Sequence, residues 1–123
     1  MPFVLLVDDS AMMVNEVSSF LNAQDIECLV ASNGLEGYQT LKSRSDIALA
    51  IVDVNMPVMD GLSMIEKVRK ELPDCAASFI MLTTEFDREH KERGKTLGVK
   101  GWIIKPFRGE NAIGIIRKFL QHE

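Results

Sequence analysis

Short apolar runs alternate with amphipathic stretches along the whole chain. The runs are rich in aliphatic residues and predict strands at residues 3–7, 28–31, 49–52, 79–82 and 102–104. Between them, apolar residues recur at three- and four-residue intervals, as in helices with one buried face. This second pattern predicts helices at residues 11–23, 35–43, 61–71, 88–97 and 110–121.

The order of these elements predicts an α/β fold, with a parallel sheet flanked by five helices. The first, third and fourth strands are continuously apolar, which is typical of strands covered on both faces. Asn33-Gly34 and Asp60-Gly61 lie between periodic segments, where turns and helix caps belong. With 123 residues and no internal repeat, we expect one domain over residues 1–123.

Composition narrows the class of protein. Apolar residues make up 46% of the chain and charged residues 26%, as in a globular protein, and the net charge of −4 argues against binding nucleic acid. The first apolar run stops at Asp8, too early for a membrane span. Cys28 and Cys75 form no disulfide framework, so we expect free thiols and a cytoplasmic protein.

Polar residues stand at or just after the predicted strand ends. Asp8 and Asp9 follow the first strand, Asp53 the third, Thr83 the fourth and Lys105 the fifth. In an open parallel sheet, the carboxyl ends of the strands line the crevice where ligands bind. We therefore expect three carboxylates, a hydroxyl and an ammonium group to meet in one pocket.

This set of groups suits metal-dependent phosphoryl transfer. Close carboxylates raise one another's pKa, and Lys105 supplies a single positive charge, so a divalent cation such as Mg²⁺ is expected. With the charge neutralised, Asp53 could act as a nucleophile and form an aspartyl phosphate. Lys105 and the Thr83 hydroxyl are groups that stabilise the charge on a transferring phosphoryl group.

Each residue also has a structural interpretation when taken alone. Asp8 or Asp9 could cap the first helix, and Thr83 could form a side-chain turn. Asp53 could be a turn residue, and Lys105 a solvated charge. Their joint placement at one edge of the sheet favours the functional interpretation.

Four motifs in order resemble the CheY-like family of response-regulator receiver domains, over essentially the whole chain. The resemblance implies a flavodoxin-like sheet of five parallel strands in the order 2-1-3-4-5, an order that is a standard example for this fold. The motifs are VDDS at 7–10, DVNMPVMDG at 53–61, LTTE at 82–85 and KPF at 105–107.

The resemblance also implies roles for the site residues. Asp53 would be phosphorylated, and the Lys105–Pro106 peptide bond would be cis. Mg²⁺ would be held by Asp9, Asp53 and the backbone carbonyl of Asn55, with Asp8 acting through bound water. Thr83 and Lys105 would contact the phosphoryl oxygens.

Three further positions bear on regulation. Asn55 and Glu85 resemble the residues of the chemotaxis member, and we expect them to give a short-lived phosphoryl group. Trp102 stands where many members place Tyr or Phe, the aromatic residue that moves inward with Thr83. The alternative is that Trp102 is fixed packing on the last strand.

By resemblance, the protein is a single-domain two-component response regulator. It would accept a phosphoryl group from a sensor histidine kinase or phosphotransfer domain and signal by binding a downstream target through the fourth helix, fifth strand and fifth helix. Chemotaxis is the favoured role, with the flagellar motor switch as one candidate target. We expect a monomer or weak dimer that catalyses only its own phosphorylation and dephosphorylation.

Other functions stay open at this point. The same receiver could serve in a phosphorelay or as a phosphate sink. A phosphatase of the haloacid-dehalogenase type would need a DxD motif after the first strand, where Asp8 and Asp9 are adjacent instead. A nucleotide- or flavin-binding loop would need glycines there. A phosphorylation-independent adaptor would not need the full set of site residues.

Overall fold

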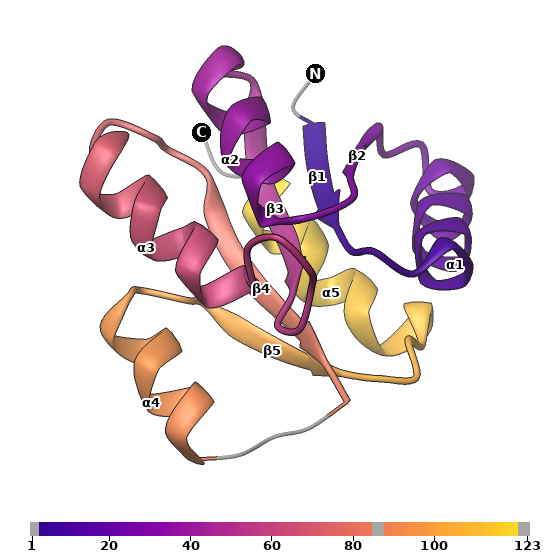
Figure 1. Cartoon of the computed structure of the whole chain (residues 1–123). Helices are drawn as coiled ribbons and strands as arrows, with labels where there is room; N and C mark the ends of the chain where they lie inside the picture. Colours follow the sequence, from indigo (N-terminus) through magenta and orange to yellow (C-terminus); the bar gives the residue numbers. More distant parts are fainter. Residues whose placement is uncertain (1–2, 85–87, 121–123) are drawn as a thin grey trace.

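The computed structural model describes residues 3–84 and 88–120. Figure 1 shows a central sheet with helices on both faces, and the chain alternates strand and helix throughout. The sheet is parallel, with the order β2-β1-β3-β4-β5 implied by the family resemblance. The elements are β1 (Phe3–Val7), α1 (Ala11–Ala23), β2 (Cys28–Ala31), α2 (Gly34–Ser43), β3 (Ile47–Asp53), α3 (Gly61–Glu71), β4 (Ser78–Thr83), α4 (Arg88–Thr96), β5 (Gly101–Ile104) and α5 (Gly109–Leu120).

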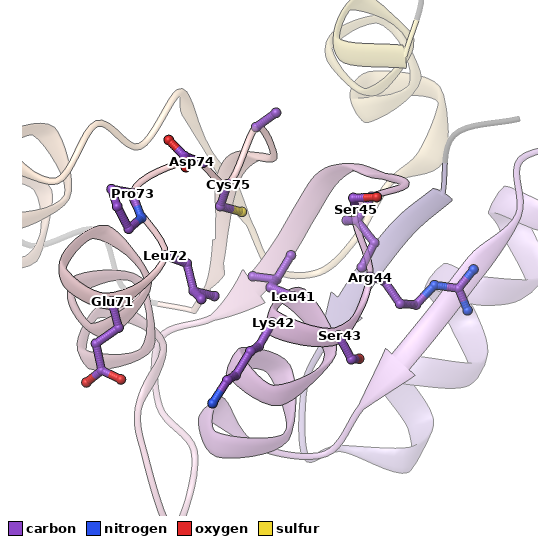
Figure 2. Close-up of a pocket in the computed structure, with 12 residues that line it drawn as sticks. Leu41, Lys42, Ser43, Arg44, Ser45, Glu71, Leu72, Pro73, Asp74 and Cys75 are labelled. Atoms are coloured by element: carbon purple, nitrogen blue, oxygen red, sulfur yellow. The ribbon is translucent and has the colours of Figure 1, made fainter.

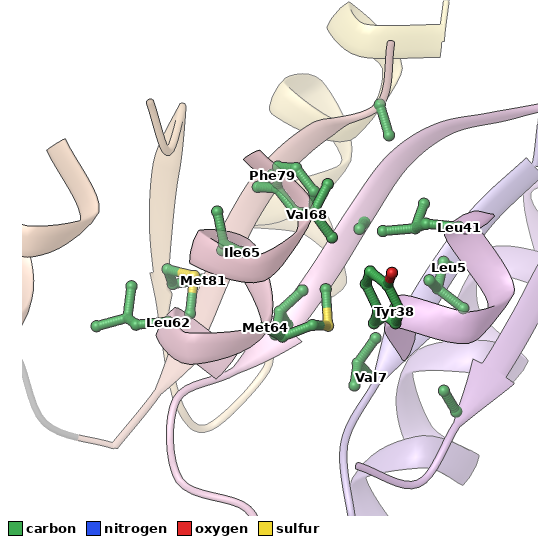
Figure 3. Packing of buried hydrophobic residues seen from close by; sticks show 14 of the residues in the cluster. Leu5, Val7, Tyr38, Leu41, Leu62, Met64, Ile65, Val68, Phe79 and Met81 are labelled. Atoms are coloured by element: carbon green, nitrogen blue, oxygen red, sulfur yellow. The ribbon is translucent and has the colours of Figure 1, made fainter. Parts of the chain in front are cut away.

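Two apolar cores lie on opposite faces of the sheet, because successive strand residues point to opposite sides. On β1, Leu5 and Val7 belong to one core, while Val4 and Leu6 belong to the other. Figure 3 shows the first core, which is closed by buried residues of α2 and α3. The second core is closed by α1 and α5. Burial on both faces explains why the central strands are continuously apolar.

The strands that carry the site are longer than their apolar runs predict. β3 spans Ile47–Asp53 rather than 49–52, and β4 spans Ser78–Thr83 rather than 79–82. The reason is register: Asp53 pairs with Leu82, and Thr83 pairs with Ile104. Polar residues at the strand ends therefore stay within the ladder.

Helix boundaries differ from the predicted ones by about a residue. α2 begins at Gly34 because Asn33 caps it, accepting a hydrogen bond from the backbone N–H of Glu36 at 2.9 Å. α4 ends at Thr96 and α5 begins at Gly109, while the predicted end of the last helix at residue 121 lies outside the described residues.

The remaining expectations concern the cysteines and the membrane. Cys28 and Cys75 are free thiols, as the sequence predicts. In the described ranges, no helix combines the length and the apolar character that crossing a membrane requires.

Candidate functional site

Three aspartates meet at the carboxyl end of the sheet. Asp8 directly follows β1, and Asp53 is the last residue of β3, the neighbouring strand. Each of Asp8, Asp9 and Asp53 offers an oxygen, and these oxygens all lie within 4.8 Å of one another. Asp8 and Asp53 are buried and Asp9 is exposed, so the cluster opens to solvent on one side. The structure therefore confirms the predicted cluster of three carboxylates.

Lys105 lies over the two buried carboxylates. Its Nζ is 3.4 Å from Asp53 Oδ1 and 3.5 Å from Asp8 Oδ2. The backbone N–H of Lys105 donates to the carbonyl oxygen of Thr83 at 2.7 Å, which ties the end of β5 to the end of β4. The Lys105–Pro106 peptide bond is cis, as the family resemblance implies.

The buried carboxylate of Asp8 is only half satisfied. Among the described residues, its Oδ1 accepts the backbone N–H of Ser10 at 2.9 Å, whereas its buried Oδ2 has the ion pair to Lys105 but accepts no hydrogen bond. Capping of α1 falls to Ser10, whose Oγ accepts the backbone N–H of Met13 at 3.2 Å. Ser10, and not Asp8 or Asp9, therefore caps the helix, so helix capping does not explain why two aspartates stand here.

These groups fit a hard divalent cation. Three carboxylates face one ammonium group, so the cluster carries excess negative charge, and the buried Oδ2 of Asp8 has an ion pair to Lys105 but accepts no hydrogen bond within the described residues. Mg²⁺ is bound in proteins through one or two carboxylates together with water and phosphate oxygens. Asn55, the other residue expected to hold the cation, lies two residues after Asp53 and has an exposed side chain.

The pKa of the Asp53 carboxyl is raised to about 6, mainly because its charged form loses solvation on burial. The negative charge of Asp8 contributes to this rise, and the positive charge of Lys105 opposes both effects. At neutral pH Asp53 is therefore mostly ionised and nucleophilic, but its charge is held at a cost that a cation or a phosphoryl group would relieve.

Two glycines let the loop after β3 come close to the sheet. The backbone N–H of Gly61 donates to the carbonyl of Val54 at 3.0 Å, and a Cβ there would collide with the carbonyl of Asp53. The N–H of Gly34 donates to the carbonyl of Met59 at 3.0 Å, where a Cβ would also collide. The sequence shows both residues as turn glycines, but not which backbone they approach.

Thr83 and Trp102, which the resemblance implies move together, lie at different places relative to the cluster. Thr83 is the last residue of β4 and is 2% exposed, next to the backbone of Lys105. Trp102 pairs with Met81 further back along the sheet and packs against the first core. Trp102 is thus outside the acidic cluster. Glu85 lies outside the described residues.

A separate hollow of about 470 Å³ lies at the opposite end of the sheet (Figure 2). It is bounded by the turn after α2 and the turn after α3, including Arg44, Pro73 and Cys75. No residue of the acidic cluster lines it, so it is not the site that the sequence predicts.

The family model of the response regulator receiver domain matches residues 4–117, and this range includes all three aspartates of the cluster. The chain belongs to this receiver-domain family. Chemotaxis protein CheY1 of Helicobacter pylori is 35% identical over 107 residues, which cover 85% of each chain. A CheY homolog of Campylobacter jejuni is also 35% identical, covering 85% of this chain and 81% of its own. The structure of CheY4 from Vibrio cholerae superimposes with a TM-score of 0.87 at 34% identity, covering 97% of this chain and 98% of that one.

Membership of the receiver-domain family makes the chain a component of two-component signalling. CheY-like receiver domains interact with kinases and downstream targets, and they bind Mg²⁺ at an acidic pocket. In this chain the corresponding feature is the cluster of Asp8, Asp9 and Asp53.

Proposed function

We propose that the protein is a response regulator whose Asp53 accepts a phosphoryl group in a Mg²⁺-dependent reaction. The observation that carries the proposal is the convergence of three carboxylates and Lys105 around a buried oxygen of Asp8 that accepts no hydrogen bond. Lys105 forms an ion pair with this oxygen at 3.5 Å, but it supplies one positive charge for three carboxylates. The remaining negative charge supports a site that receives a divalent cation rather than a purely structural cluster.

The reacting group is the carboxylate of Asp53. One of its oxygens forms a bond to phosphorus as the bond between phosphorus and the donor nitrogen breaks, and the electron pair leaves with the histidine of the donor. The ammonium of Lys105, already 3.4 Å from Asp53, lies where it can offset negative charge on the transferred group. Thr83, at the end of the adjacent strand, is proposed to donate its hydroxyl proton to another phosphoryl oxygen.

Asp9, Asp53 and the backbone carbonyl of Asn55 are the proposed ligands of Mg²⁺, with Asp8 acting through bound water. When bound, the metal supplies positive charge that balances the cluster and the incoming phosphoryl oxygens. Asp8 would contribute by its buried position, since it adds a fixed negative charge to a cluster that Lys105 alone does not balance.

Asn55 and Glu85 are proposed to set the lifetime of the phosphoryl group. The side chain of Asn55 is exposed and small, which supports access of water to the site. We expect a short-lived phosphorylated form, suited to rapid signalling. A half-life of many hours, measured after removal of the donor, would contradict this.

We propose that a sensor histidine kinase or phosphotransfer domain donates the phosphoryl group. We propose that a downstream target protein binds the face formed by α4, β5 and α5. A groove of about 570 Å³ on this face is lined by Trp102, Ile104 and Ile115, with Arg108 and Lys105 beside them. Apolar walls with basic neighbours suit an acidic, partly apolar segment of a target. Names of the relatives support chemotaxis as the role, with the flagellar motor switch as a candidate target.

The test is labelling with acetyl phosphate, a small donor that needs no partner protein. We expect acid-labile phosphate on the wild type when Mg²⁺ is present, and none on Asp53→Asn. Labelling of Asp53→Asn, or labelling of the wild type that is unchanged by a chelator of Mg²⁺, would overturn the proposal.

The alternative functions differ in the fate of the phosphoryl group after it reaches the protein. A phosphorelay or sink receiver would return its phosphoryl group to a histidine protein, and a phosphatase would turn over a small phosphate ester many times. We propose instead that the chain catalyses only its own phosphorylation and dephosphorylation, as a cytoplasmic monomer or weak dimer.

A further inference from the structure

Helix α4 has a polar, mostly exposed surface. Its sequence, REHKERGKT, is polar throughout, and of its nine residues Gly94 alone is buried. Arg93 joins it to α3 through exposed contacts, at 3.2 Å to Glu66 and 3.4 Å to the Ser63 hydroxyl. Such exposed pairs contribute little to stability. Gly94 is therefore the point at which the described part of α4 is buried against the domain.

Gly94 lies against the indole ring of Trp102. A Cβ at position 94 would be 2.8 Å from Cζ2 of Trp102 and 3.5 Å from its Cη2. The first distance is shorter than carbon atoms tolerate, so any larger residue would move the indole or the helix. The backbone of α4 is fixed there by Val99, whose N–H donates to the carbonyl of Gly94 at 2.9 Å.

Trp102 in turn belongs to the strand that carries Lys105 to the site. It stands three residues before Lys105, and β5 is in register with β4, so that Trp102 pairs with Met81 and Ile104 with Thr83. The indole and Lys105 therefore belong to one strand and its end, and the backbone N–H of Lys105 donates to the carbonyl of Thr83 at 2.7 Å. The indole is the part of β5 that touches α4 at Gly94.

We propose that Gly94 is a positioning residue for Trp102, and that the space it leaves beside the indole sets how tightly the site binds a phosphoryl group. The inference rests on the proposed function of Asp53. Glycine is among the least favourable residues in a helix interior, and here it provides the space that the large indole needs. Coupling between two sites is reciprocal, so a change at the contact alters the affinity of the site for a phosphoryl group.

The test compares Gly94→Ala with Gly114→Ala, a matched control in α5 where a Cβ would meet no atom within 4 Å. Binding of beryllium fluoride, a phosphoryl mimic, is followed by ¹⁹F NMR with Mg²⁺ present, and Trp102 emission is recorded on the same samples. We expect Gly94→Ala to shift both the emission and the affinity, the latter by about fivefold or more. Gly114→Ala should leave both unchanged.

Rescue by a smaller aromatic residue shows whether the effect passes through the indole. Phenylalanine lacks the atom that a Cβ at position 94 would strike, so Trp102→Phe combined with Gly94→Ala should bind the mimic as Trp102→Phe does alone. If Gly94→Ala folds poorly, the double variant should recover the fold. Persistence of either defect in the double variant would overturn the inference.

The outcomes also separate this inference from the proposed function. Wild type that binds no mimic would overturn both. Wild type that binds, with Gly94→Ala indistinguishable from Gly114→Ala, would overturn the coupling and leave phosphorylation of Asp53 intact.

Discussion

Replacing Asp53 by asparagine should stabilise the folded protein at neutral pH. The carboxyl is buried beside Asp8, and its pKa rises from 3.8 to about 6. Between these two values the folded protein binds more protons than the unfolded chain, so the free energy of unfolding falls as pH rises. Above about pH 6 the full penalty is present, and asparagine removes it while keeping the shape of the side chain.

The size of the effect follows from the shift in pKa. Each pKa unit corresponds to 1.36 kcal/mol, so a shift of about two units gives about 3 kcal/mol as an upper bound. Because Lys105 loses a partner in the variant, we expect a gain of about 1–3 kcal/mol in the free energy of unfolding. For a chain of this length each kcal/mol raises Tm by about 3–5 °C.

The assay is urea unfolding without Mg²⁺, followed by circular dichroism at pH values from about 4 to 8. We expect the stabilities of wild type and Asp53→Asn to converge near pH 4, to separate as pH rises from about 4 to 6, and to differ by a constant amount above that. Asp9→Asn is the control, because Asp9 is exposed and should change stability much less. A variant less stable than wild type at pH 8, or a difference independent of pH, would refute the reasoning.

Three further substitutions test other parts of the account. Asp8→Asn removes a charge that raises the pKa of Asp53, so this pKa should fall in an NMR titration, while Mg²⁺ affinity in calorimetry drops about tenfold. Lys105→Met should raise the pKa of Asp53 and slow its labelling by acetyl phosphate by roughly 10²-fold, measured as initial rates; an unchanged rate would exclude Lys105 from the reaction. Tyr38→Phe loses a 2.7 Å hydrogen bond to Glu71, so it should lose about 1 kcal/mol of stability in urea and keep the wild-type labelling rate.

Much of the fold was predictable from the sequence, because both faces of the central strands are buried and the helices have one apolar face. The strand ends were less so. Asp53 and Thr83 are polar, so the apolar pattern stops before them, whereas backbone pairing with Leu82 and Ile104 continues. Register depends on the neighbouring strand, which a local pattern does not contain.

The sequence was enough to predict which residues cluster at the site, but not how deeply each is buried or which hydrogen bonds it makes. The sequence places Asp8 after a strand, yet only the fold shows that one of its oxygens is buried without a hydrogen bond while Ser10 caps the helix. The contact between Gly94 and Trp102 was missed for the same reason. A glycine inside a polar helix was the available signal, and its partner lies on another element.

The central claim is that Asp53 accepts the phosphoryl group and needs a divalent cation to do so. The most direct measurement is reduction of the acetyl-phosphate-treated protein with borohydride, which converts an acyl phosphate into a stable alcohol, followed by peptide mass mapping. We expect the modification on Asp53 alone and only when Mg²⁺ is present. Modification of Asp8 or Asp9 instead, or equal modification of Asp53 in a chelator, would contradict the claim.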